Sequence, residues 1–422
     1  MPRPPVRAAA LVVLIALACT NDISAPGVCP QFCPLGSLTV IDTLLAAISR
    51  DSAYGRPQGY VNPGLSLTLL AASEPGIKDS RPIMLMPALP TRLVLEDTTT
   101  APVIGVDSIV LAVTITSRDT LVTNLALSVY ALPLSIDSTT TFTGLAPAFA
   151  APPIRTVNVN SLLATPAYNN PATGDSAILD TVYHRVTLLI NFDSAQVPYS
   201  VPDTGKLAFG IRVGADQPTD LSLGGLLNYG LGPSITAYLK VDSLGLGVAH
   251  RRTPLGFGTP SFNTFVFNPP PPPLDSTLVV GGVPATRSIL RITFPRIIRD
   301  SQQIARATLE LIPAVLPQGV ASDSFDLVTQ AVLVDLGAKS ALDPIHVDTT
   351  RIYITPMDTV RIEMTNLMRF WAADTTAPTA IVLRQAPEGG NFAELRMFAS
   401  STTAYRPMLH LTYSPSFPFG QR

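Results

Sequence analysis

The side chains best suited to acid–base chemistry are few and scattered along this sequence. Its four histidines stand far apart, at His184, His250, His346 and His410. His410 alternates with two leucines in a strand-like run, so we expect it on the solvent side of a strand. The chain contains no short motif of a serine hydrolase, a zinc protease, a P-loop or a dinucleotide-binding protein. The sequence therefore predicts no catalytic residues and a protein that is not an enzyme.

Carboxylates offer the alternative route to catalysis, because glycoside hydrolases use paired acids in a cleft. Glu363 could face Glu394 or Glu310 across neighbouring strands. Outward carboxylates on a β-sandwich are usually just solvated, so we favour a surface role for all three. Three arginines are expected to pair with nearby acids: Arg287, Arg291 and Arg306.

Aspartates are common in the predicted loops, where they could hold structural calcium. They stand at Asp97, Asp137, Asp216, Asp220, Asp323, Asp348 and Asp374. None of these loops has the dense alternating aspartates of a calcium-binding loop. We therefore predict no metal site and no cofactor, and keep structural calcium as the alternative.

Trp371, the single tryptophan, could stack on a sugar ring. With Leu367 and Phe370 it forms an apolar stripe at the spacing of one helical turn, which favours a core position instead. Tyr130, Tyr238 and Tyr405 are better candidates for exposed aromatic side chains, although nothing in the sequence groups them. The ligand-binding residues, if any, stay unknown at this stage.

Cys29 and Cys33 form an isolated pair in the segment Cys-Pro-Gln-Phe-Cys. Two cysteines of an exported chain most simply form a small disulfide loop. A metal or redox pair is the alternative. The spacing is not the CxxC of redox proteins, and no histidine lies near enough in sequence to complete a zinc site.

The N-terminus has the pattern of an export signal, with Arg3 and Arg7 before the short apolar run 8–17. The following Ile-Ala-Leu-Ala-Cys segment, which ends at Cys19, resembles the lipobox of bacterial lipoproteins. That resemblance implies cleavage after a signal peptide of residues 1–18 and acylation of Cys19, so that the membrane is the expected partner. An ordinary signal peptide cut near Ala18 is the alternative. Thr20 lacks the acidic character of an inner-membrane retention signal, which favours the outer membrane.

Composition narrows the fold class. The chain has 422 residues, of which 46% are hydrophobic, 14% are charged, 41 are proline and 27 are glycine. Proline and glycine spread through a chain suit many short strands joined by turns. The net charge of -2 argues against nucleic acid as a partner, because phosphate binding needs a basic face.

Strict alternation of apolar and polar residues predicts strands with one buried face. The clearest runs are 109–115, 125–130, 186–192, 207–213, 235–241, 288–294 and 307–311. We predict an all-β fold of two antiparallel β-sandwich domains in tandem, both jelly-roll-like. The predicted boundaries are a tether at 19–36, a first and diverged copy at 37–246, a linker at 247–260 and a second copy at 261–418.

The second copy also resembles a known family. Ser288–Phe294, Ile304–Leu311, Ile362–Trp371, Ala380–Leu383, Phe398–Ser401 and Arg406–Tyr413 resemble, in order, the motifs of DNRLRE-type domains. These are secreted β-sandwich modules, some of which bind carbohydrate. The resemblance covers about residues 277–414, and it implies a β-sandwich and a polysaccharide as an alternative partner.

Together these features predict a non-catalytic exported lipoprotein of the cell envelope. It would be an outer-membrane lipoprotein, periplasmic or surface-exposed, that acts in adhesion, in envelope structure or as a binding module. Its partners would be the membrane, through Cys19, and envelope proteins. A carbohydrate-binding protein is the alternative.

Overall fold

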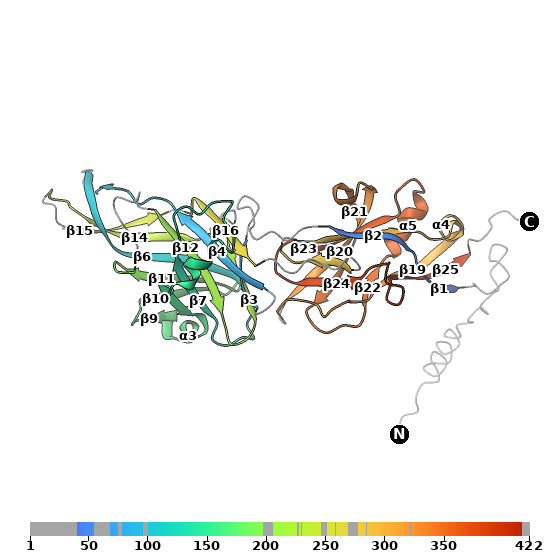
Figure 1. The fold of residues 1–422 in the computed structure, drawn as a ribbon, viewed down its shortest axis with the longest axis horizontal. Coiled ribbons are helices and arrows are strands. Elements are labelled where there is room, and N and C mark those ends of the chain that lie inside the picture. The colour runs from blue at the N-terminus through green and yellow to red at the C-terminus, as the bar shows by residue number, and fades with distance from the viewer. Residues whose placement is uncertain are drawn as a thin grey trace, which may run out of the picture.

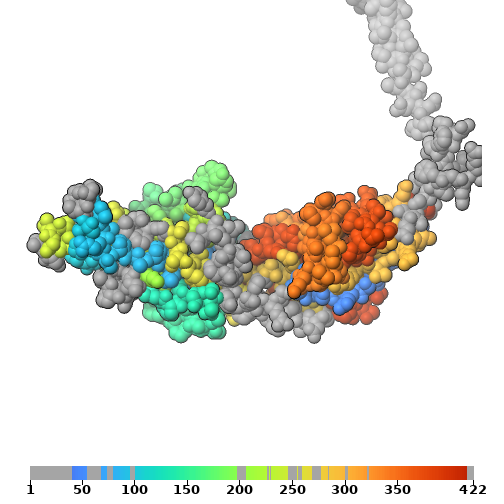
Figure 2. Space-filling model, turned by 90° about the horizontal axis from the view of Figure 1, so that it is seen from above, coloured from blue at the N-terminus to red at the C-terminus, as the bar shows by residue number. Residues whose placement is uncertain are grey.

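The computed structural model is all-β and built from antiparallel strands, as predicted. It describes residues 40–54, 68–74, 78–95, 100–196, 206–225, 228, 230–245, 251–257, 259–268, 277–283, 285–320 and 323–415. The strands gather in two lobes that lie end to end along the long axis (Figure 1). Figure 2 shows the same two lobes from above. We call residues 68–268 the inserted lobe, and residues 40–54 with 277–415 the terminal lobe.

The described part of the inserted lobe forms one hydrogen-bonded network of 14 strands. These are β3 (Thr68–Glu74), β4 (Lys78–Met86), β5 (Arg92–Val94), β6 (Thr100–Arg118), β7 (Ala126–Ala131), β8 (Arg155–Asn158), β9 (Asn169–Asn170), β10 (Asp175–Asp180), β11 (Arg185–Asp193), β12 (Leu207–Gly214), β13 (Thr219–Gly224), β14 (Ser234–Val241), β15 (Arg251–Phe257) and β16 (Phe262–Phe267). Three short helical segments join them: α2 (Ala146–Ala150), α3 (Val159–Leu163) and η2 (Pro166–Tyr168).

Strand β6 organises this network, because its 19 residues pair with β5, β14, β11 and β13. Ile109, Leu111 and Val113 of β6 are fully buried, and Val110 and Ala112 between them are half-buried on the other face. The same alternation buries one face of β11 and β14, whereas β12 is buried on both faces over residues 207–211. The strands predicted from these runs are therefore confirmed.

The terminal lobe has a four-stranded sheet, in the order β1-β25-β19-β22, and a five-stranded sheet, in the order β2-β18-β23-β20-β21. Its strands are β1 (Ile41–Leu45), β2 (Ile48–Tyr54), β17 (Thr277–Gly281), β18 (Arg287–Ile292), β19 (Gln302–Leu311), β20 (Ser324–Val334), β21 (Ala341–Tyr353), β22 (Val360–Glu363), β23 (Ala380–Ala386), β24 (Glu394–Phe398) and β25 (Met408–Pro415). Its helical segments are α4 (Arg296–Ser301), η3 (Gly337–Lys339) and α5 (Thr365–Ala373).

One buried core lies between the two sheets of the terminal lobe. Leu309, Ile362 and Leu411 reach it from the four-stranded sheet, and Leu290 and Ile381 reach it from the five-stranded sheet. All five side chains are 0% exposed. Two sheets that share one core give the lobe a β-sandwich-like character.

The N-terminal strands do not join the lobe that follows them in sequence. Ile41 pairs with Tyr413 in β1 and β25, and Tyr54 pairs with Arg287 in β2 and β18. The predicted boundary at 37–246 is therefore wrong for residues 41–54, which belong to the terminal lobe. A period of two shows which residues of a strand are buried, but it does not show which distant strand will be the partner.

The predicted linker at 247–260 and the start of a second copy at 261 are also corrected. Residues 251–257 form β15, which pairs with β14, and residues 262–267 form β16, which pairs with β4. Both strands therefore belong to the inserted lobe. The sequence did not predict β15, because Pro254 and Gly256 are unusual in the interior of a strand. Proline is nevertheless tolerated on an edge strand such as β15.

The two lobes meet at a cluster of three phenylalanine rings. Phe392 of the terminal lobe packs against Phe265 and Phe267 of β16, with ring centroids 6.4 and 6.2 Å away and steep interplanar angles. Phe392 is 1% exposed and belongs to the hydrophobic core of the inserted lobe, as does Val283. The lobes therefore share buried apolar surface in addition to the chain connections.

Candidate functional site

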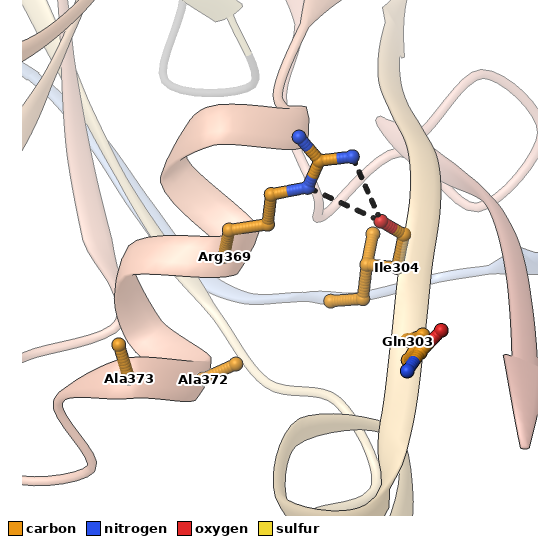
Figure 3. Close-up of a pocket in the computed structure, with 5 residues that line it drawn as sticks. All are labelled: Gln303, Ile304, Arg369, Ala372 and Ala373. Carbon is orange, nitrogen blue, oxygen red and sulfur yellow. Dashed lines mark hydrogen bonds between the residues drawn. The ribbon is translucent and has the colours of Figure 1, made fainter. Parts of the chain in front are cut away.

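A hollow of about 470 Å³ opens between α5 and the start of β19 (Figure 3). It is lined by Gln303, Ile304, Arg369, Ala372 and Ala373. The Nε and Nη2 groups of Arg369 each donate a hydrogen bond of 3.2 Å to the carbonyl oxygen of Ile304. These bonds fix the guanidinium at the rim of the hollow and leave Nη1 outside them (Figure 3).

The position of Arg369 follows from the amphipathic pattern of α5. Leu367, Met368 and Trp371 are buried in the core of the terminal lobe, so Arg369 lies on the exposed side of the helix. Trp371 is 0% exposed, and its ring lies 6.3 Å from that of Phe294. The prediction that Trp371 is a core residue is confirmed, and no sugar can stack on it.

The three tyrosines proposed as exposed aromatics differ in their surroundings. Tyr130 is only 7% exposed, because Phe149 covers it at a ring distance of 5.0 Å, so this prediction was wrong. Tyr238 is half-buried. Tyr405 is 50% exposed but stacks on Phe398, with centroids 4.9 Å apart. The three lie on different elements and form no common binding strip.

The carboxylates considered for catalysis pair with arginines. Glu310 accepts a hydrogen bond of 3.0 Å from Arg361, and Glu394 accepts one of 2.5 Å from Arg396. Glu363 lies 3.8 Å from Arg306 and also accepts hydrogen bonds from Thr365. Glu363 is exposed and Glu310 is half-buried, but Glu394 is only 4% exposed, so the prediction of a surface role was wrong for Glu394.

The predicted ion pairs of the arginines are confirmed. Arg287 pairs with Glu388 and Arg291 pairs with Asp335, each with a closest distance of 2.5 Å, while Arg306 pairs with Glu363. The hydrogen bonds from Arg291 hold the pKa of Asp335 below its usual value. The pKa of Arg287 is raised by its hydrogen bonds to Glu388.

Strand β21 carries two titratable groups that face α5 and β22. The Nδ1 atom of His346 lies 2.6 Å from an Asp343 carboxylate oxygen, and the ring stacks on Phe370 at 4.1 Å. Burial raises the pKa of Asp348, while a hydrogen bond from Asn366 opposes that shift. His410 is exposed, as predicted, and His250 lies outside the described residues.

A second, smaller hollow in the inserted lobe has a cavity volume of about 120 Å³ and a lining that mixes polar and apolar surface. Most of its wall consists of hydroxyl and amide side chains: Thr156, Asn158, Ser161, Thr165, Asn170 and Thr173. Asp175 also lines it and is held by Arg155 through bonds of 2.8 and 3.2 Å. This ion pair leaves the wall without a net charge.

Several aspartates expected to mark calcium loops cap their own turns. Asp137 accepts hydrogen bonds from Thr139, and Asp374 accepts them from Thr376. These bonds lower the pKa of both carboxyls. Over the described ranges, no group of three potential metal ligands comes together. Asp97, Cys19, Cys29 and Cys33 lie outside the described residues.

No protein family and no curated protein sequence matches this chain. Within the described part of the structure, none of the helices has the length and apolar character needed to span a bilayer. The sequence did not point to Arg369, Arg155 or Asp175, because each is an ordinary polar residue without a motif around it. Only the amphipathic stripe of α5 contained a signal, since it indicates which side of the helix Arg369 occupies.

Proposed function

We propose that the chain is an exported lipoprotein, anchored through Cys19, that serves without catalysis as an adhesion, structural or binding module of the cell envelope. The observation that supports this role is the place where the chain enters the fold. Ile41 and Ile304 both pair with Tyr413, and Gln302 pairs with Pro415. The first and last described strand ends therefore lie together, beside α4 and α5.

This end of the terminal lobe lies opposite the inserted lobe along the long axis (Figure 1). An anchor upstream of residue 40 would hold the terminal lobe next to the membrane and present the inserted lobe outward. The 20 residues from 20 to 39 can span at most about 70 Å. Such an arrangement suits a protein that displays a folded surface within reach of this tether from a membrane.

We also propose that both lobes are jelly-roll-like sandwiches and that the terminal lobe is DNRLRE-like. Its support is the order of the resembling segments, which fall on successive elements of this lobe. Ser288–Phe294 spans most of β18, Ile304–Leu311 lies in β19, Ile362–Trp371 covers β22 and α5, and Arg406–Tyr413 leads into β25.

Metabolic labelling with a palmitate analogue tests the anchor. The full-length chain should incorporate the label, and Cys19→Ser should abolish incorporation, while the matched control Cys29→Ser should retain it. Mass spectrometry of the N-terminal peptide should show diacylglyceryl cysteine at position 19. Label retained by Cys19→Ser, or a mature N-terminus at another residue, would refute the lipoprotein proposal.

Carbohydrate binding is the second candidate function, and the smaller hollow of the inserted lobe favours it. Its hydroxyl and amide side chains, its apolar patches and an Arg155–Asp175 pair that is already satisfied suit a neutral polyhydroxyl ligand. A polysaccharide panel should show binding that Asn158→Ala and Asn170→Ala weaken and Tyr405→Ala leaves unchanged. Equal binding by all these variants, or no binding to any polysaccharide, would refute it.

A further inference from the structure

The end of the terminal lobe where the chain enters carries arginine and isoleucine side chains that anchoring alone does not require. We propose that this surface rests on the anionic phosphate headgroups of the membrane that holds the anchor. We call it the end face and define it by Arg296, Ile297, Arg299 and Arg369. The proposal rests on the proposed function, because it takes the anchor to lie upstream of residue 40.

The strand register brings the end face together from distant parts of the sequence. Helix α4 is followed at once by β19, whose first residue Gln302 pairs with Pro415. Ile304 pairs with Tyr413, which also pairs with Ile41 at the start of β1. Arg369 of α5 donates hydrogen bonds to Ile304. The basic helices and the entry point of the chain therefore occupy one end of the lobe (Figure 1).

The charges of the end face complement a phosphate surface. Arg296 and Arg369 are exposed, and neither forms an ion pair with a described side chain. Arg299 stands half-buried in the same helix as Arg296. Guanidinium groups bind phosphate oxygens through paired hydrogen bonds, and the hollow of about 470 Å³ beside Arg369 has room for a headgroup.

The apolar part of the end face is the side chain of Ile297 in α4. Ile297 is 63% exposed between exposed Arg296 and buried Ile298. Basic residues around exposed aliphatic side chains are the pattern by which proteins lie on an anionic lipid surface.

Two acidic residues close to this end, Asp42 and Asp374, bond to neighbouring threonines. Asp42 accepts a hydrogen bond of 2.5 Å from Thr412, and Asp374 accepts bonds of 2.7 and 2.9 Å from Thr376. Asp300 follows in α4 and is kept in every variant below. Arg296 and Arg369 of the end face are therefore exposed, while Asp42 and Asp374 bond locally.

Vesicle co-sedimentation tests the proposal independently of acylation. The chain from residue 19 with Cys19→Ser is mixed with phosphatidylcholine vesicles that contain or lack phosphatidylglycerol. We expect binding to the anionic vesicles that weakens as salt is added. The double variant Arg296→Gln/Arg369→Gln should bind about thirtyfold less, since each basic residue near an anionic surface contributes about 1 kcal/mol. Ile297→Asn should weaken binding further.

Matched controls separate docking from folding. Arg92→Gln/Ile178→Asn removes an exposed arginine and an isoleucine that is 59% exposed in the inserted lobe, and it should bind like the parent chain. Arg369→Lys should retain binding within about threefold, because the charge is kept. Equal binding to both vesicle types, binding unchanged in the double variant, or no vesicle binding by the parent chain would overturn the end-face proposal. If the chain incorporates the palmitate label but does not bind anionic vesicles, only the docking proposal is refuted. If the chain binds anionic vesicles but incorporates no label at Cys19, only the anchor is refuted.

Discussion

Replacing Phe392 by alanine should uncouple the two lobes. The ring is 1% exposed and makes edge-on contacts with Phe265 and Phe267 across the junction. Removing a buried phenylalanine costs about 3–5 kcal/mol of unfolding free energy. About 1–3 kcal/mol of this belongs to the two aromatic contacts, at roughly 0.5–1.5 kcal/mol each. That share is the coupling between the lobes.

The single tryptophan gives an assay that reports one lobe. Trp371 fluorescence follows the terminal lobe, while far-UV circular dichroism follows both lobes during urea unfolding. The two transitions should coincide in the parent chain and separate in Phe392→Ala, because coincident probes indicate cooperative unfolding. The matched control Phe325→Ala empties the core of the terminal lobe only and should lower the tryptophan midpoint. If Phe392→Ala loses less than about 1 kcal/mol of unfolding free energy, or if its two transitions still coincide, the claim that Phe392 couples the lobes is refuted.

Three further substitutions test particular contacts. Trp371→Phe should lower the free energy of unfolding by less than about 1.5 kcal/mol, because the buried indole Nε1 has no hydrogen-bond partner among the described residues, and a larger loss in urea unfolding would contradict this. Arg291→Ala should lower the free energy of unfolding by at most about 1 kcal/mol at neutral pH. Because Arg291 lowers the pKa of Asp335, the difference in stability between the variant and the parent chain should disappear as the pH falls through that lowered pKa. A difference that stays constant in thermal unfolding at several pH values would contradict this. Asp348→Asn should raise the free energy of unfolding slightly at neutral pH. Because burial raises the pKa of Asp348, this gain in stability should shrink as the pH falls through that raised pKa. A gain in stability that grows in acid would refute the reasoning.

The buried faces of the strands could be predicted from the sequence, and their partners could not. Ile109, Leu111 and Val113 lie in the core as their alternation indicated, and Trp371 does so as its helical stripe indicated. Tyr130 was predicted to be exposed because it points to the outer face of β7. Alternation cannot show that Phe149 of α2 covers that outer face.

Strand pairing across several hundred residues was the main feature that sequence reasoning missed. Ile41–Leu45 pairs with β25, and nothing in five residues of alternating pattern specifies a partner so far along the chain. Arg369 was missed for a different reason. Its importance depends on the entry point of the chain and on α4, and only the three-dimensional arrangement brings these together.

The central claim is that the anchor holds the terminal lobe near the membrane and presents the inserted lobe outward. Energy transfer to an acceptor dye in the bilayer tests it on the acylated protein, with donors on Ile345→Cys in the terminal lobe or Leu121→Cys in the inserted lobe and with Cys29 and Cys33 replaced by serine. These sites are 79% and 74% exposed, so each should accept a label. The account predicts markedly stronger transfer from position 345 than from position 121. Equal transfer from both positions, or stronger transfer from position 121, would contradict it.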